Sequence, residues 1–239
     1  MKLIGVLGGL SWESSAEYYR IINQEIARRC GGLSSARVLL SSVDFSFYAQ
    51  AMEEGCWDLI HAALVQEALR LKRGGAEGLV IATNTMHRFA SELGAVSGLP
   101  LIHIADATAT AAKASKAKIV GLMGTRYTME GEFYRKRLQE VHGLQVLVPE
   151  EAERTEINRI IFSELCAGSF KDGSTKQLVK FAEKLAARGA DGIILGCTEL
   201  PLVMKDGVIN IPFWDTTRLH CLAAVDFMLE NPVDLKEIV

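Results

Sequence analysis

Short, mainly apolar runs alternate along the chain with longer stretches that carry a single apolar face. The short runs, which include residues 2–7, 37–42, 78–81, 101–104, 118–124 and 193–195, predict strands. The run 193–195 has no polar face, which is typical of a strand buried on both sides, as in a parallel sheet. A first helix is predicted after Ser14 or Ser15 as N-cap, ending near Gly31. Further helices are predicted over residues 57–73, from Asp106 onward, and over residues 216–229. The stretch 43–55, with Tyr48 and Met52, is predicted to be an irregular lid or specificity loop.

The pattern then repeats. Residues 118–124 (KIVGLMG) resemble residues 2–8 (KLIGVLG), and residues 188–197 (RGADGIILGC) resemble residues 74–83 (GGAEGLVIAT). We therefore predict a tandem repeat of about 115 residues. The predicted halves are residues 1–115, to which a helix crossing back from 214–239 could be added, and residues 116–239. The tail beyond Asn231 is predicted to be loosely held.

Strands that alternate with helices favour an α/β fold. We expect two pseudo-symmetric αβα halves, each with a mainly four-stranded parallel sheet. Small-molecule sites favour the junction of two such halves, so an active-site cleft is expected between them.

Cys197 stands just past one of the buried strands, after Gly196 and before Thr198 and Glu199. The carboxyl edge of a parallel sheet is where α/β folds place ligands. A helix beginning at Thr198 would favour the thiolate. A buried cysteine is, however, often only a small apolar residue in a core.

The repeat places Thr83 at the position that matches Cys197. Two acid/base groups on opposite faces of one carbon are what stereoinversion requires. The short polar residues beside them, Asn84 and Thr85 in one half and Thr198 and Glu199 in the other, could hold an α-carboxylate and an α-amino group.

The glycine turn after the first strand predicts a small anion site made of backbone N–H groups. Its residues, Gly8 to Ser15 with Leu10 and Ser11, match neither a dinucleotide fingerprint nor a Walker A motif. A small carboxylate suits it better, and a tight turn without a ligand is the alternative. Thr125 lies at the matching place in the second half.

Composition narrows the class of protein. A net charge of −3, from 26 basic and 29 acidic residues, disfavours nucleic-acid and anionic-membrane partners. The 5 cysteines show no metal-ligand spacing, so we expect free thiols, no metal and a cytoplasmic location. The strand-end motifs contain no lysine that could form a Schiff base, so a pyridoxal phosphate site is not expected.

Together, the two halves, the turn GGLSWESS, the NTMH run from Asn84 and the GCTE run from Gly196 resemble the aspartate/glutamate racemase family. The resemblance covers essentially the whole chain. It implies a cofactor-independent amino-acid racemase and a homodimer. Members usually carry two catalytic cysteines, of which the second matches Cys197 and the first falls on Thr83.

The Thr83/Cys197 pair most closely resembles the branch specific for L-aspartate and L-glutamate. The resemblance implies that Cys197 takes the Cα proton of the L-substrate and that Thr83, or water held by it, returns one. The asymmetric pair predicts a kinetic bias between enantiomers. Residues 44–50 lack the basic side chains with which relatives recognise a second carboxylate, so other small amino acids remain open.

Further residues and functions stay open. His87 and His103 are candidate catalytic groups, although a structural hydrogen bond explains His87 equally well, and Cys166 is a candidate to line the site. The alternative functions are a single-cysteine decarboxylase or dicarboxylate cis–trans isomerase of the same superfamily, and a non-enzymatic amino-acid-binding protein.

Overall fold

The computed structural model describes residues 1–205 and 207–230, and these form two compact units. The first unit is Met1–His103 together with the chain from His220, and the second is Ile104–Leu219. We predicted a boundary between the halves after residue 115, whereas the two units of the structure divide between residues 103 and 104. The predicted loose tail lies outside the described residues.

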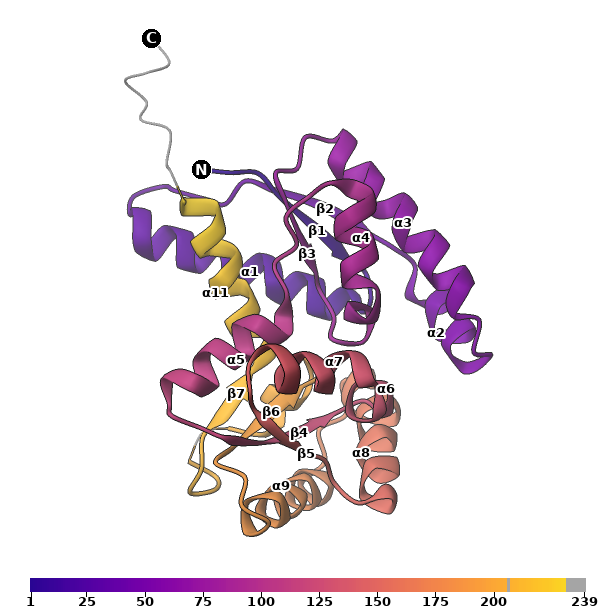
Figure 1. The fold of residues 1–239 in the computed structure, drawn as a ribbon, viewed down its shortest axis with the longest axis vertical. Coiled ribbons are helices and arrows are strands. Elements are labelled where there is room, and N and C mark those ends of the chain that lie inside the picture. The colour runs from indigo at the N-terminus through magenta and orange to yellow at the C-terminus, as the bar shows by residue number, and fades with distance from the viewer. Residues whose placement is uncertain (206, 231–239) are drawn as a thin grey trace. The chain divides into compact units, whose positions relative to one another are not determined.

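The first unit contains a three-stranded parallel sheet (Figure 1). Its strands are β1 (Ile4–Gly8), β2 (Val38–Ser42) and β3 (Gly78–Ile81), in the order β2-β1-β3. The fourth strand predicted at 101–104 is wrong, because only Leu101 pairs, as an isolated parallel bridge to Leu79. Ile104 already begins a helix, which leaves too few residues for a strand.

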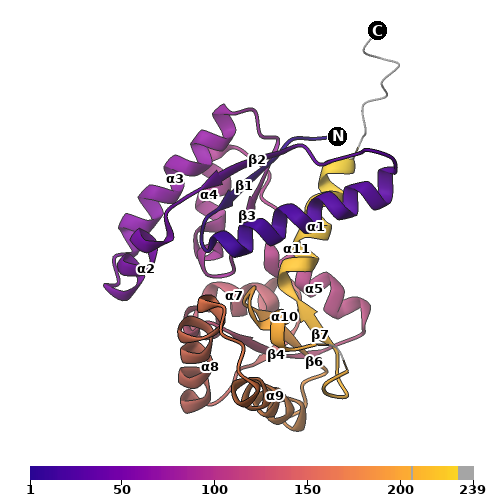
Figure 2. The same ribbon diagram turned by 180° about the vertical axis from the view of Figure 1, so that it is seen from behind.

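Helices cover both faces of this sheet (Figures 1 and 2). They are α1 (Trp12–Cys30), α2 (Phe45–Glu53), α3 (Trp57–Arg73), the 3₁₀ helix η1 (Thr85–Phe89), α4 (Ala90–Ser97) and the part of α11 (Thr216–Leu229) from His220 onward. Ile4, Val6 and Val80 pack against α1 and α11. Gly5 faces the other way, where a Cβ would lie 3.2 Å from that of Leu71 on α3.

Two local predictions in this unit are corrected. The N-cap of α1 is Ser11, not Ser14 or Ser15, because the Ser11 side chain accepts a hydrogen bond from the Ser14 backbone. The stretch predicted as an irregular lid forms α2, a helix of 9 residues whose N-cap is Asp44. Its buried face consists of Tyr48, Ala51 and Met52.

The second unit contains a four-stranded parallel sheet, as predicted. Its strands are β4 (Ile119–Gly124), β5 (Gln145–Leu147), β6 (Gly192–Gly196) and β7 (Phe213–Asp215), in the order β5-β4-β6-β7. Its other elements are α5 (Ile104–Ala114), α6 (Arg126–Glu130), α7 (Glu132–Lys136), the π-helical η2 (Arg137–Val141), α8 (Glu151–Ser163), η3 (Leu165–Ala167), α9 (Asp172–Ala187) and α10 (Leu200–Val203). The strand order of the first unit matches β5-β4-β6, which agrees with the sequence repeat.

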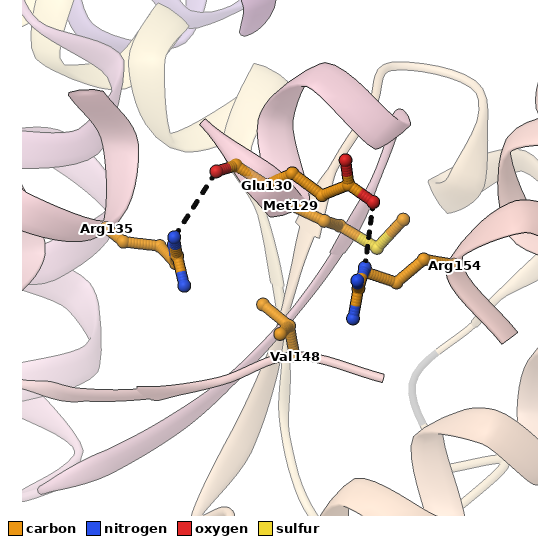
Figure 3. A pocket seen from close by; sticks show the side chains of 5 residues that line it. All are labelled: Met129, Glu130, Arg135, Val148 and Arg154. Atoms are coloured by element: carbon orange, nitrogen blue, oxygen red, sulfur yellow. Dashed lines mark hydrogen bonds and ion pairs between the residues drawn. The ribbon is translucent and has the colours of Figure 1, made fainter. Parts of the chain in front are cut away.

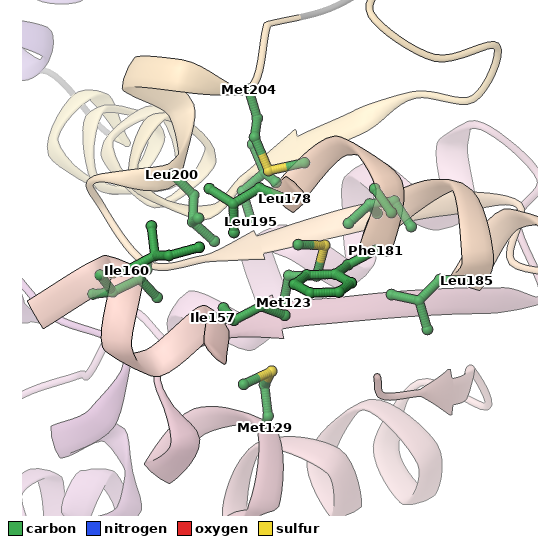
Figure 4. Packing of buried hydrophobic residues seen from close by; sticks show 14 of the residues in the cluster. Met123, Met129, Ile157, Ile160, Leu178, Phe181, Leu185, Leu195, Leu200 and Met204 are labelled. Carbon is green, nitrogen blue, oxygen red and sulfur yellow. The ribbon is translucent and has the colours of Figure 1, made fainter. Parts of the chain in front are cut away.

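The apolar run of β6 is buried on both sides. Its successive side chains point to opposite faces of the sheet, and helices cover each face. Ile193 and Leu195 belong to a cluster built mainly from α8 and α9 (Figure 4). Ile194 points the other way, into a cluster that contains Ala105 of α5 and Tyr134 of α7. This packing holds the end of β6, and therefore the backbone of Cys197, in place.

Within residues 1–205 and 207–230, none of the helices is both long enough and apolar enough to cross a membrane.

Candidate functional site

The turn after β1 is built around a glycine with positive φ. Gly9 has φ 84°, and a Cβ there would lie 2.2 Å from the carbonyl oxygen of Val43, so no larger residue fits. The Gly9 N–H donates to Oγ of Ser15 over 2.7 Å. Leu10 is buried and Ser11 is half-buried at the start of α1. The predicted strand, glycine turn and helix are therefore present.

Thr83 lies just past β3, on the edge of the sheet where β1 also ends. It is half-buried, whereas the next two residues, Asn84 and Thr85, are buried at the start of η1. Nδ1 of His87 lies 2.7 Å from the carbonyl oxygen of Thr83. Because a carbonyl only accepts, His87 is the donor and its Nδ1 carries the proton. The structural hydrogen bond considered for His87 is present.

Three histidine rings and one tyrosine form a buried cluster behind Thr83. The rings of His103 and His220 lie 4.8 and 5.3 Å from that of His87. Nε2 of His220 donates to the carbonyl oxygen of Ile102 over 2.7 Å, so in the neutral ring Nδ1 is the acceptor for the Tyr18 hydroxyl at 2.8 Å. The sequence separates these residues widely, and nothing in it predicted that they would meet.

In the second unit, β4 and β6 end side by side. Gly124 pairs with Gly196, so Thr125 and Cys197 are the next residues along neighbouring strands. Thr125 caps α6, because its Oγ1 accepts from the backbone of Thr128. The register therefore brings two predicted site residues to one place on the sheet edge.

Cys197 is buried and its thiol donates to a carboxylate. The Sγ atom lies 2.8 Å from Oε2 of Glu199, and the Thr198 hydroxyl donates to the same oxygen over 2.7 Å. Burial raises the pKa of Cys197 well above its ordinary value, and the negative charge of Glu199 and their hydrogen bond raise it further. The resting group is thus a protonated thiol that donates to a carboxylate, and that carboxylate is itself oriented by the Thr198 hydroxyl.

This geometry overturns the expected helix at Thr198. α10 begins at Leu200, has only 4 residues, and places Glu199 at its N-cap. A short helix with a carboxylate at its start does not favour the thiolate, and the pKa of Cys197 is raised. Glu199 was expected to contact substrate, so its contact with the thiol is a feature that sequence reasoning missed.

Cys166 of η3 packs against the same apolar cluster as Cys197. Its proximity also contributes to the raised pKa of Cys197. Cys166 is half-buried, which distinguishes it from Cys221, a buried cysteine in the core of the first unit.

The predicted site residues divide between the two units. The first unit holds Leu10, Ser11, Thr83, Asn84 and Thr85. The second holds Thr125, Cys197, Thr198 and Glu199, of which the last three are joined by the hydrogen bonds described above.

The model of the Asp/Glu/hydantoin racemase family matches residues 7–224. The chain belongs to this family. Among solved structures, a candidate Asp/Glu racemase from Yersinia pestis is 46% identical with a TM-score of 0.91, over 96% of this chain and 100% of the other. An aspartate racemase homologue from Pyrococcus horikoshii OT3 is 34% identical with a TM-score of 0.82, over the same shares.

Another relative has a broader description. The broad specificity amino-acid racemase RacX of Bacillus subtilis (strain 168) is 23% identical over 224 residues, which cover 92% of this chain and 95% of RacX. Membership of the family was expected from the GGLSWESS, NTMH and GCTE runs, and it is confirmed.

Proposed function

We propose that this chain is an amino-acid racemase that inverts Cα of small acidic amino acids without pyridoxal phosphate. The observation that carries the proposal is the 2.8 Å hydrogen bond from the buried Cys197 thiol to Glu199 at the carboxyl edge of β6. Family membership supports it, because relatives of this chain are described as racemases of amino acids.

Cys197 acts as the base in this proposal. Its thiol passes a proton to Glu199, and the resulting thiolate removes the Cα proton of the L-substrate. Backbone N–H groups at the strand ends, with the side chains of Asn84, Thr85 and Thr125, would hold the α-carboxylate and stabilise the enolate-like charge that develops on it.

Thr83 supplies the second proton. Its hydroxyl, or a water bound to it, protonates Cα from the opposite face and is then re-protonated by solvent. Glu199 returns its proton to solvent, so protons balance and the substrate has exchanged one hydrogen. A hydroxyl is a far weaker acid than a thiol, so Thr83 is the less effective half of the pair, and it limits inversion equally in both directions.

The asymmetry has a defined kinetic signature. Enantiomers have equal free energies in solution, so kcat/KM for net inversion must be equal in the two directions. Exchange without inversion is under no such constraint, because it involves Cys197 alone. We therefore expect Cα exchange with solvent to be faster from the L-enantiomer than from the D-enantiomer.

The test is deuterium incorporation at Cα in D₂O, followed by NMR for a panel of L- and D-amino acids. We expect incorporation from L-glutamate or L-aspartate in the wild type and in Cys221→Ala, the matched control that removes a buried cysteine from the first unit, and none in Cys197→Ala. Undiminished exchange in Cys197→Ala, or no exchange with any amino acid, would refute the proposal. Equal rates from L- and D-glutamate would refute the asymmetric mechanism.

The same experiment separates the alternatives. A decarboxylase would release CO₂, and a non-enzymatic binding protein would retain its ligand affinity in Cys197→Ala without any exchange. We further propose a homodimer, as the family resemblance implies, which sedimentation tests directly.

A further inference from the structure

A small cavity in the second unit has an arginine-rich wall and no role in the proposed reaction (Figure 3). Its volume is about 290 Å³, and its lining residues are Met129, Glu130, Arg135, Val148 and Arg154. Figure 3 shows these side chains converging from α6, α7, α8 and the segment after β5.

The cavity lies at the ligand-binding edge of the sheet. Val148 directly follows β5, and Met129 and Glu130 belong to α6, which follows β4 after one residue. β4 and β5 are parallel neighbours, so both elements start from the same carboxyl edge. Cys197 follows β6, on the other side of β4.

Arg154 and Glu130, two of the charged residues in the wall, form an ion pair with each other. Nε of Arg154 donates to Oε1 of Glu130 over 3.0 Å, and its Nη1 donates to the carbonyl oxygen of Pro149 over 2.9 Å. Glu130 also accepts from Arg126 over 2.9 Å. Burial raises the pKa of Glu130, but the hydrogen bonds from the two arginines lower it overall, so the carboxylate stays charged.

Arg135 is the charged residue of the wall whose hydrogen-bonding groups are least satisfied. Its Nη2 makes a 3.3 Å hydrogen bond to the carbonyl oxygen of Glu130, whereas its Nε is buried and has no hydrogen-bond partner among the described residues. Guanidinium does not lose its proton in proteins, so this donor is permanent. A buried donor without an acceptor costs roughly 1–3 kcal/mol, so the hydrogen-bonding capacity of this guanidinium is poorly satisfied within the described residues.

We propose that this cavity binds a small oxyanion, a carboxylate or a phosphate, with Arg135 as its main anchor. A guanidinium carries a permanent charge on a planar set of N–H donors, a geometry that matches both anions. With two arginines and one glutamate, the wall carries a net positive charge. Met129 and Val148 supply an apolar wall for the short carbon chain of a carboxylate.

The test is calorimetric titration of the full-length protein with sodium butyrate, sodium acetate and sodium phosphate, each against sodium chloride at equal ionic strength. We expect saturable binding to the wild type. Affinity should fall by about tenfold or more in Arg135→Gln, because a tenfold change corresponds to about 1.4 kcal/mol, which is close to the smallest contribution of a hydrogen bond to a charged group. Butyrate binding more tightly than acetate identifies a carboxylate with a carbon chain, and preference for phosphate identifies the other anion.

Two variants control the result. Lys136→Gln removes the neighbouring charge, which is exposed and paired with Glu132, and should bind as the wild type does. Arg135→Lys keeps the charge but loses the planar set of donors, and should be intermediate. The proposal is overturned by no saturable binding beyond chloride, by equal affinity in Arg135→Gln, or by a changed oligomeric state of that variant in sedimentation, which would assign Arg135 to a protein partner. None of these readouts depends on racemase activity.

Discussion

Replacing Glu199 by glutamine should make the proton of the Cys197 thiol easier to remove. The substitution keeps the size of the side chain and removes its charge. In the wild type, burial is the largest cause of the raised pKa of the thiol, and the adjacent charge is the next. Burial is unchanged in Glu199→Gln, so the pKa of Cys197 should fall while remaining above its ordinary value.

The separation of 2.8 Å between Sγ and Oε2 gives a lower limit for the effect. Two unit charges at that distance repel by about 1.5 kcal/mol even at the dielectric constant of water, and by more in a buried site. An energy of 1.4 kcal/mol is a factor of ten in an equilibrium. At a fixed pH below the pKa, the thiolate population should therefore increase by about tenfold or more.

The assay is a pH titration of thiolate absorbance at 240 nm, taken as the difference between each protein and the same protein carrying Cys197→Ala. That difference removes the signals of the other four cysteines. Glu199→Asp, which keeps the charge, serves as the matched control and should titrate at higher pH than Glu199→Gln. If Glu199→Gln titrates at the same pH as the wild type or above it, the charge of Glu199 does not hold the thiol proton and this reasoning fails.

Three further predictions follow from the same packing. His87→Gln should lose the hydrogen bond to Thr83 and about 1–3 kcal/mol of unfolding free energy in urea, whereas His87→Asn, whose amide N–H lies near the place of Nδ1, should retain most of both; equal losses would count against this bond. Folding raises the pKa of Cys197, so its contribution to stability is complete below the unfolded pKa of about 8.5 and is lost as pH rises through the folded value. The wild type should therefore lose more unfolding free energy above about pH 9 than Cys197→Ala does, and parallel pH curves would contradict this. In Gly124→Ala a Cβ would lie 2.7 Å from a carbonyl oxygen of the neighbouring strand, which should cost about 1–3 kcal/mol, whereas Gly173→Ala, where nothing lies within 4 Å, should not destabilise the protein in thermal melts.

Buried strands and long amphipathic helices were predictable because one physical pattern decides each of them. The bounds of α3, α11 and β3 agree with the sequence prediction residue for residue. A wholly apolar run ending in glycine has few alternatives to a central parallel strand. The repeat was predictable for the same reason, since both halves carry that run in the same order.

The errors in the sequence prediction lie in segments that are short or whose sequence pattern is weak. α2 was mistaken for a loop, although Asp44 is a good N-cap and its apolar positions recur at helical spacing, because aromatic residues occupy several of them. The expected strand at 101–104 has Pro100 before it and a helix from Ile104, so three residues between them make a single bridge. The histidine cluster unites residues distant in sequence, and only tertiary packing creates it.

The most instructive error concerns Cys197, because the two candidate influences on its proton have opposite signs. A helix N-terminus favours the thiolate by about 0.3–1 kcal/mol at an ordinary site. A carboxylate at 2.8 Å opposes it by more than that, and burial adds to the opposition. The sequence placed both influences next to the thiol, and only the rotamer of Glu199 shows which one prevails. In the proposed mechanism, the carboxylate that keeps the resting sulfur protonated is also the group that accepts its proton when substrate is bound. In the proposed mechanism, Cys197 and Glu199 therefore act as a pair at this strand end.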